Sequence, residues 1–282
     1  MKELVKSFVG STANNRLAWF AYRMCGGLAR NLGQIYGHAR FSRETLEHDD
    51  TLARFCDELF PDRKVVSGPF KGLKYPRLRS VGSALLPKLL GSYESELHAA
   101  LEMLLKQDYS TIVDIGCAEG YYAVGLALRL PNARIYAFDT DSRARDSCAE
   151  MAKLNCVDGR IQIGSFCDVS ALRSIPLGSK ALIIADCEGY EKMLFSGQTN
   201  AILARHDLIV EVHDFIDISI SECLRDAFSK THCVESIKSI DDIEKVHRYH
   251  YEQLRNYDTG ERRLILAERR PAIMEWLVMT PF

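Results

Sequence analysis

The residues with the clearest chemical pattern lie between Val113 and Tyr122 and read Val-Asp-Ile-Gly-Cys-Ala-Glu-Gly-Tyr-Tyr. An apolar run ends in a turn that holds two glycines, and a helical pattern follows as far as Leu130. Glycine at positions 116 and 120 lets the backbone approach a ligand without a Cβ clash, and the start of the helix presents free N–H groups. The pattern predicts a nucleotide-type cofactor site at the end of a strand.

The spacing within this turn argues against a dinucleotide. That fingerprint needs glycine where Ala118 and Tyr121 stand, and Glu119 would repel a pyrophosphate. S-adenosylmethionine carries no phosphate, and its sulfonium and ammonium groups tolerate acids nearby. We therefore expect S-adenosylmethionine as the cofactor, with contacts from Asp114, Gly116, Cys117, Ala118, Glu119, Gly120 and Tyr121.

Acids follow the next two apolar runs as well. Asp139 comes 19 residues after Gly120, where a carboxylate can accept hydrogen bonds from both ribose hydroxyls, and Thr140 follows it. Phe166 and Asp168 follow the third run, where they could flank adenine and reach its amino group. The alternatives are an acid that caps the next helix, for Asp139, and a simple loop acid, for Asp168.

The fourth and fifth runs end in Asp186-Cys-Glu188 and Glu211-Val-His213. Side chains alternate along a strand, so the two polar residues of each run share a face. If the cofactor donates its methyl group to a hydroxyl, a base must remove the hydroxyl proton, and an imidazole titrates near neutral pH. We expect His213, Asp186 and Glu211 to be catalytic, with His213 as the base and Asp186 also close to the cofactor. A structural pair of strand-end residues is the alternative for Glu211 and His213.

These acids, together with Asp214, could also bind Mg²⁺, which prefers carboxylate oxygens. We favour the version without a metal ion, in which His213 alone takes the proton, because acids are common at strand ends. Magnesium stays the alternative.

The methyl acceptor is expected to meet Glu188, Tyr190, Arg248 and Tyr251. The last two lie in residues 239–261, which we expect to join the last two strands above the cofactor. Long connections in compact domains are usually functional or disordered, and aromatic rings suit the faces of sugars. The alternative is a surface helix with a solvated basic face.

The elements that must position these residues form an α/β pattern. Strands are expected at residues 111–115, 134–138, 161–165, 181–185, 208–212, 233–237 and 263–267, with helical patterns between the first six. This order predicts a Rossmann-like, mostly parallel seven-stranded sheet whose last strand is antiparallel. We expect an N-terminal helical region at 1–65, a connecting hairpin and helix at 66–109, and the cofactor-binding domain at 110–282.

Two segments resemble a known family. Residues Gly116–Ala127 and Asp186–Glu191 are similar to the FkbM-type branch of the class I S-adenosylmethionine-dependent methyltransferases, and its D-x-E-G-x-E signature is complete in the second segment. Residues 68–75 and 90–97 also resemble segments of such proteins. The resemblance covers residues 66–215, and it implies the class I methyltransferase fold and O-methylation of sugars or natural products.

Composition limits the partners. The net charge of −2 lacks the basic excess expected of a protein with an obligatory nucleic-acid partner. Nine cysteines without a C-x-x-C pair are typical of reduced thiols in a reducing compartment. No secretory signal or transmembrane run stands out, so we expect a cytoplasmic protein. The N-terminal helices could form a homo-oligomer contact.

The sequence thus predicts an S-adenosylmethionine-dependent O-methyltransferase that acts on a small molecule, a sugar or a glycan. Two other functions stay open. The chain could bind the cofactor without catalysis, as a regulatory or scaffold protein, or it could methylate a macromolecule or a nitrogen atom. Methylation of a nucleobase amino group would call for a D/N-P-P-aromatic turn, which Asp186-Cys-Glu-Gly189 does not provide.

Overall fold

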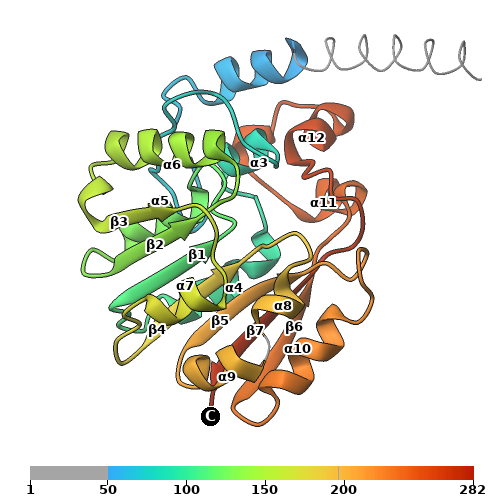
Figure 1. The fold of residues 1–282 in the computed structure, drawn as a ribbon. Coiled ribbons are helices and arrows are strands. Elements are labelled where there is room, and N and C mark those ends of the chain that lie inside the picture. The colour runs from blue at the N-terminus through green and yellow to red at the C-terminus, as the bar shows by residue number, and fades with distance from the viewer. Residues whose placement is uncertain (1–49, 196) are drawn as a thin grey trace, which may run out of the picture. The chain divides into compact units, whose positions relative to one another are not determined.

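The computed structural model describes residues 50–195 and 197–282 (Figure 1). The chain divides into two compact units, Met1–Ala53 and Arg54–Phe282, and the second unit is described below. Most of the predicted N-terminal helical region, with its proposed oligomer contact, lies outside the described residues. Residues 54–59 are helical. The predicted domain boundaries stay predictions.

Seven strands form one sheet. They are β1 (Thr111–Ile115), β2 (Arg134–Phe138), β3 (Ile161–Gly164), β4 (Ala181–Ala185), β5 (Asp207–Val212), β6 (His232–Lys238) and β7 (Glu275–Pro281). The strand order is β3-β2-β1-β4-β5-β7-β6. The first five strands are parallel, and β7 runs antiparallel to both β5 and β6. The predicted Rossmann-like α/β sheet with an antiparallel last strand is confirmed.

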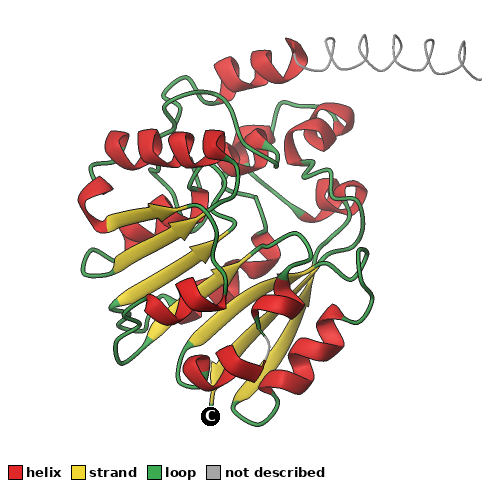
Figure 2. Ribbon diagram, viewed as in Figure 1, coloured by secondary structure: helices red, strands yellow, loops and turns green. Residues whose placement is uncertain are grey.

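Helices cover both faces of this sheet (Figures 1 and 2). The helices are α3 (Leu85–Leu90), α4 (His98–Leu104), α5 (Tyr121–Arg129), α6 (Ser142–Leu154), α7 (Val169–Ser174), α8 (Glu191–Leu194), α9 (Gly197–Leu203), α10 (Ile220–Phe228), α11 (Asp242–Arg248) and α12 (Thr259–Leu266), with 3-10 turns at Ser95–Leu97, Asp158–Arg160 and Glu252–Leu254. Helices α5 and α6 contact β2 and β3, whereas α7 to α10 pack on the opposite face. Within the described residues, no helix combines the length and apolarity needed to cross a membrane.

The central strands are buried along their whole length because both faces of the sheet are covered. Every residue of β1, β4 and β5 is buried. On one face, Val113, Ile183 and Val210 belong to the same apolar cluster as Leu172 of α7 and Leu224 of α10. This packing fixes the strand ends, from which the site residues project.

The last predicted strand, at residues 263–267, is wrong. Those residues belong mostly to α12, whose first turn carries a capping box between Asp258 and Glu261. An apolar run such as Leu264-Ile-Leu is compatible with a strand or a helix. The capping box upstream stabilises the helix start, so the run is helical. The antiparallel strand is β7, so the connection between the last two strands is residues 239–274 rather than 239–261.

The segment before the sheet folds back on itself. Val65 N donates to Leu73 O, and Lys64 and Lys74 form an antiparallel bridge, so residues 64–65 pair with residues 73–74 at the start of the predicted connecting segment. This fold places the following segment, residues 80–97, along one side of the cavity described next.

Candidate active site

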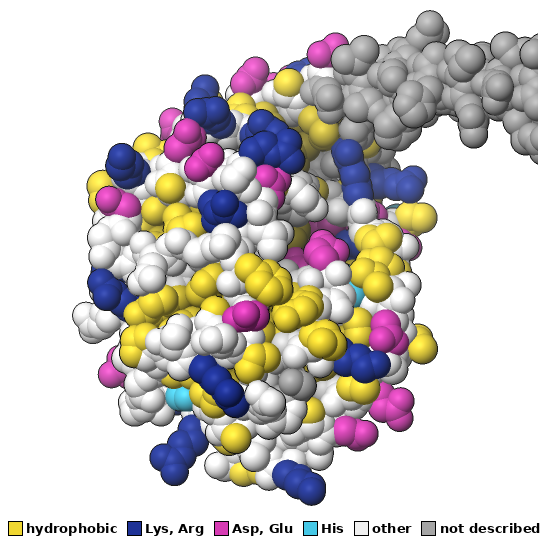
Figure 3. Space-filling model, viewed as in Figure 1, with side chains coloured by type: hydrophobic (Ala, Val, Ile, Leu, Met, Phe, Trp, Pro, Cys, Tyr) yellow, Lys and Arg dark blue, Asp and Glu magenta, His cyan; other side chains and the backbone are white. Residues whose placement is uncertain are grey.

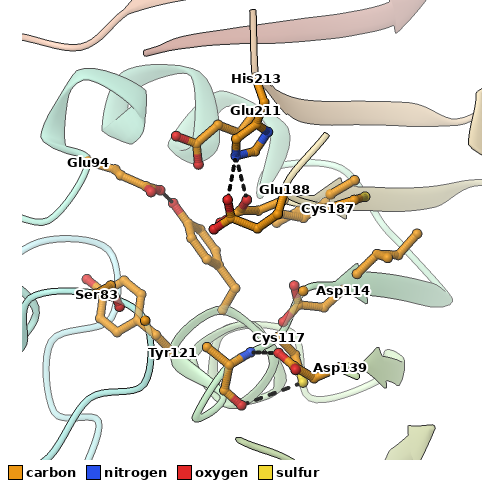
Figure 4. Close-up of a pocket in the computed structure, with 18 of the residues that line it drawn as sticks. Ser83, Glu94, Asp114, Cys117, Tyr121, Asp139, Cys187, Glu188, Glu211 and His213 are labelled. Carbon is orange, nitrogen blue, oxygen red and sulfur yellow. Dashed lines mark hydrogen bonds and ion pairs between the residues drawn. The ribbon is translucent and has the colours of Figure 1, made fainter. Parts of the chain in front are cut away.

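A cavity of about 470 Å³ lies at the carboxyl ends of the parallel strands (Figure 4). Its lining includes Gly116 after β1, Asp139 after β2, Asp186 after β4, and Glu211 and His213 at the end of β5. Ligands of open α/β sheets bind at this edge, and small-molecule sites commonly measure about 300–1,000 Å³. The cavity therefore brings together residues that the sequence analysis took from four different strand ends.

The glycine turn packs tightly against the end of β4. Gly116 has φ +87°, and a Cβ atom there would lie 1.9 Å from the carbonyl oxygen of Asp186. Gly120 caps α5 with φ +98°, and a Cβ there would lie 2.9 Å from the sulfur of Cys148. The predicted cofactor residues Cys117, Ala118 and Tyr121 line the cavity. Gly120 does not line it and instead forms the N-cap of α5.

Asp139 lies where the sequence predicts it. Its Oδ2 accepts a hydrogen bond from Ala118 N at 2.9 Å, and its Oδ1 accepts one from Asp141 N at 2.9 Å. Each carboxylate oxygen can accept a second hydrogen bond. Asp139 and Thr140 both line the cavity, so the carboxylate is held in place with acceptor capacity to spare.

The residues after β3 divide into two kinds. Phe166 is half exposed and lines the cavity, with its ring centroid 5.2 Å from that of Tyr190. Asp168 does not line the cavity. Its Oδ1 accepts from Ala171 N at 2.7 Å and caps α7. The structure thus uses Asp168 as a helix cap, the kind of local role that competes with ligand binding for any acid in such a loop.

Glu119 is not among the lining residues, although we predicted it as a cofactor contact. It is buried and forms an ion pair with Lys88 at 2.7 Å, and it accepts hydrogen bonds from Ser80 Oγ and Val81 N. Burial alone would raise the pKa of Glu119, but the Lys88 charge and these hydrogen bonds outweigh it and lower the pKa. Through these contacts, Glu119 holds residues 80–88 next to the turn that contains Gly116 and Gly120.

Asp114 is a buried carboxyl group on the cavity wall. Loss of solvation raises its pKa to about 7, and the charges of Asp186 and Asp139 add to this effect. Among the described residues, its Oδ2 atom has no hydrogen-bond partner. A buried carboxyl group in this state would be stabilised by a cationic ligand.

The ends of β4 and β5 meet at His213. Its Nε2 lies 3.4 Å from Asp186 Oδ1 and 3.5 Å from Glu188 Oε2, and Figure 4 shows the ring facing Glu188. Glu188 has φ +51°, an uncommon conformation for a residue other than glycine. The predicted proximity of Asp186, Glu188 and His213 is therefore present.

The residue that orients His213 is Glu191. Its Oε1 lies 2.8 Å from His213 Nδ1 and also accepts from the backbone N–H groups of Cys187 and Gly189. Burial alone would lower the pKa of His213, but the hydrogen bond to Glu191 and the neighbouring acids outweigh it and raise the pKa. The sequence analysis did not single out Glu191, because an acid in the first turn of a helix is common there.

Glu211 is held instead by Arg270. The two groups lie 2.5 Å apart, and Arg270 also contacts Glu94 and Glu268, each at 2.8 Å. Burial raises the pKa of Glu211, and the charge of Asp186 adds to this effect, whereas Arg270 opposes it. This buried network forms one wall of the cavity.

The sequence analysis identified only Glu211 among the residues of this network. Glu94 lies in the 90–97 segment that carries part of the family resemblance, so a signal was present for it. Arg270 has no motif around it, and two of its three partners, Glu211 and Glu94, lie 59 and 176 residues away in the sequence. The guanidinium also lies over the Trp276 ring, 4.7 Å from its centroid.

Two of the four predicted acceptor contacts line the cavity, namely Glu188 and Tyr190. Arg248 and Tyr251 do not. Arg248 is half exposed on α11 and pairs with Glu244, and the Tyr251 ring packs near Tyr249. The long connection still reaches the cavity, through its later residues Glu268, Arg269, Arg270, Pro271 and Met274.

The lining of the cavity is acidic. Its seven carboxylate side chains are Glu94, Asp114, Asp139, Asp186, Glu188, Glu211 and Glu268, against the three cationic side chains of Lys88, Arg269 and Arg270. Figure 3 shows acidic groups beside a hollow on this face, among apolar side chains. Such a lining attracts cations and repels phosphate groups.

The chain was compared with protein-family models, curated proteins and solved structures. Residues 97–185 match the family model described as ribosomal protein L11 methyltransferase (PrmA). A search of curated proteins finds no match. Similar solved structures include precorrin-6y C5,15-methyltransferase from Geobacter metallireducens GS-15, with 13% identity, a TM-score of 0.46 and coverage of 64% of this chain and 86% of that one.

Two further structures are similar to the chain. Precorrin 8w decarboxylase from Methanobacterium thermoautotrophicum has 18% identity, a TM-score of 0.42 and coverage of 64% of this chain and 87% of that one. Geranyl diphosphate C-methyltransferase from Streptomyces coelicolor A3(2) has 11% identity, a TM-score of 0.42 and coverage of 69% and 80%. The chain has the fold of the class I S-adenosylmethionine-dependent methyltransferases, as its strand order shows, and a methyltransferase family model matches residues 97–185.

Proposed function

We propose that the protein is an S-adenosylmethionine-dependent methyltransferase of the FkbM type, and that it methylates a hydroxyl group of a sugar, a glycan or a small natural product. One observation carries the proposal. A single acidic cavity at the carboxyl ends of the parallel strands holds the glycine turn at Gly116, the carboxylate of Asp139 and the polar groups that follow β4 and β5. The family-model match over residues 97–185 supports the cofactor half of the proposal.

The residues of the cavity fit the parts of this cofactor. Asp139 has acceptor capacity for the ribose hydroxyls, and Thr140 and Phe166 line the same cavity, where they could contact the adenine ring. Asp114 and Asp186 are carboxyl groups whose pKa values burial raises to about 7, so a cationic ammonium or sulfonium group would stabilise their ionised forms.

When bound, the cofactor supplies an electrophilic methyl group. The protein must then hold the acceptor oxygen in line with that methyl group and allow its proton to leave. The cavity is also lined by the three residues expected to be catalytic, His213, Asp186 and Glu211, together with Glu188. These four residues lie at the ends of β4 and β5, whereas the glycine turn follows β1. We propose that the part of the cavity next to these four residues holds the acceptor hydroxyl.

Aromatic side chains support a sugar or a similar ring as the acceptor. Tyr93, Tyr190, Phe215 and Trp276 all line the cavity, and such rings can stack on the faces of sugars. The acidic lining disfavours a polyphosphate or a nucleic-acid backbone. A cytoplasmic location and a homo-oligomer contact through the N-terminal helices stay predictions.

The proposal is tested with purified protein and cofactor carrying a labelled methyl group. We expect label to enter hydroxylated small molecules or glycans, from a defined panel and from the small-molecule fraction of a lysate. Label found only in protein or RNA would contradict the proposed acceptor class. Cofactor binding without transfer to any fraction would favour the regulatory or scaffold function.

A further inference from the structure

Three side-chain atoms that could bind a metal ion converge in the cavity. They are His213 Nε2 and one carboxylate oxygen each from Asp186 and Glu188, and all lie within 4.8 Å of one another. They come from the ends of two neighbouring strands, β4 and β5, which are paired in the sheet. Figure 4 shows the imidazole facing Glu188.

The other ring nitrogen of His213 is already engaged. Glu191 is fully buried, and its Oε1 also accepts the N–H groups of Cys187 and Gly189, so it acts as an acceptor toward Nδ1. In the neutral imidazole Nδ1 then carries the hydrogen, and Nε2 presents a lone pair. That lone pair faces two carboxylate oxygens, and either a proton or a metal ion between these atoms would stabilise the arrangement.

The distances distinguish a proton from a metal ion. Nε2 lies 3.4 and 3.5 Å from the two oxygens, which is longer than the usual N–H···O range of about 2.7–3.2 Å. Two ligand atoms that are each about 2.1 Å from one tetrahedral centre lie about 3.4 Å apart. The two distances from Nε2 therefore fit atoms that share a cation better than atoms that share a hydrogen, and the three ligand atoms all lie within 4.8 Å of one another.

A second observation concerns the atoms themselves. Asp186 Oδ1 is buried and has no hydrogen-bond partner among the described residues, although it belongs to this cluster. The hydrogen bond from Nδ1 to Glu191 is the carboxylate–histidine arrangement that commonly supports a histidine bound to a metal. Both features are explained if a cation completes the site.

We propose that Asp186, Glu188 and His213 bind one divalent transition-metal ion of the Mn²⁺, Co²⁺ or Zn²⁺ type. The imidazole ligand disfavours Mg²⁺, which prefers oxygen ligands alone. This inference rests on the proposed function, and it changes the role of His213 from a free base to a metal ligand. With three protein ligands, the ion keeps open positions for an acceptor.

The ion defines the acceptor more closely. An acceptor hydroxyl bound to it has a lowered pKa, so its proton passes more easily to solvent. The oxygen lone pair then forms the new bond to the methyl carbon, while the carbon–sulfur bond breaks and its electron pair stays on sulfur. Two open positions suit two adjacent oxygens, so the expected acceptor is a vicinal diol or a hydroxyl next to a carbonyl.

The test measures metal binding directly on chelator-treated protein. Mn²⁺ binding by electron paramagnetic resonance and Zn²⁺ binding by calorimetry should each show one ion per chain. His213→Ala and Glu188→Gln should weaken Mn²⁺ binding by about tenfold or more, the scale of losses at metal sites. Glu188 is 77% exposed, so its variant is expected to fold, and thermal melting checks both variants.

Asp214→Asn is the matched control. Asp214 is adjacent to His213 but accepts from Ser221 N and Ser221 Oγ and does not line the cavity, so its variant should bind Mn²⁺ like the wild type. Failure of both Mn²⁺ and Zn²⁺ to bind, or equal Mn²⁺ binding by folded His213→Ala, overturns the inference and leaves His213 as a free base. S-adenosylhomocysteine binding in the same samples separates the two claims, because binding of that product without metal would leave the proposed function standing.

Discussion

His213 and Glu191 are joined across the ends of β5 and α8 by a contact of 2.8 Å between Nδ1 and Oε1. The carboxylate is fully buried and fixes which ring nitrogen faces the cavity. Glu191→Gln keeps an acceptor oxygen but removes the charge, so Mn²⁺ affinity should fall about 10- to 100-fold. S-adenosylhomocysteine affinity should stay the same, since Glu191 does not line the cavity. Equal Mn²⁺ affinity in the folded variant would show that this pair does not support a metal ligand.

The ion pair between Lys88 and Glu119 should stabilise residues 80–88. Both side chains are nearly fully buried, so Lys88→Met leaves an uncompensated carboxylate and should cost about 3–5 kcal/mol in the free energy of unfolding. The double variant Lys88→Met with Glu119→Gln removes that charge and should recover much of the loss. Urea unfolding measures both variants. If the double variant is as unstable as the single one, the loss comes from packing rather than from the buried charge.

The glycine at 116 is required by space as well as by backbone conformation. Gly116→Ala would place a Cβ atom 1.9 Å from Asp186 O, whereas Gly72, with φ +94°, has nothing within 4 Å of the same position. Gly72→Ala should cost only the left-handed strain of about 1–2 kcal/mol. Gly116→Ala should destabilise the protein more and weaken cofactor binding. Equal unfolding free energies for the two variants would mean that the turn relaxes freely.

Asp114 should make stability depend on pH in the cofactor-free, chelator-treated protein. Burial raises its pKa from the usual 3.8 to about 7, so the folded state binds a proton that the unfolded state has already lost. Stability should therefore fall as pH rises from about 4 to 7, by up to about 1.4 kcal/mol for each unit. Asp114→Asn should make this part of the curve less steep, because the buried Asp186 and Glu211 carboxyl groups still contribute to the slope. Parallel curves for wild type and variant over that window would contradict the assignment.

Most strands of the sheet could be predicted from the sequence, because parallel strands that are covered on both faces appear as short apolar runs. All of β1, β2 and β4 lie where they were predicted. Strand β7 was missed because the apolar run within α12 has the same appearance as a strand. The signal that identifies α12 as a helix is the capping box between Asp258 and Glu261. This capping box lies before the apolar run rather than within it.

The site residues that directly follow strands were predicted from the sequence. The site residues that come together from distant loop segments were missed. Asp139, Asp186 and His213 follow apolar runs, so the sheet itself brings them to one edge. Arg270 and Glu94 meet only through the fold of the long connection and the 80–97 segment. Loop acids such as Asp168 were misassigned because an acid that binds a ligand and one that caps a helix have the same local sequence.

The central claim is that the cavity binds S-adenosylmethionine. Calorimetry with S-adenosylhomocysteine tests it most directly, since the product binds without turnover. The account predicts one site per chain, no binding of NAD, and a loss of about 1–3 kcal/mol in Asp139→Ala. Asp141→Asn, which changes the neighbouring helix cap, should bind like the wild type. Binding of NAD in place of S-adenosylhomocysteine, or no binding of either by folded protein, would contradict the account.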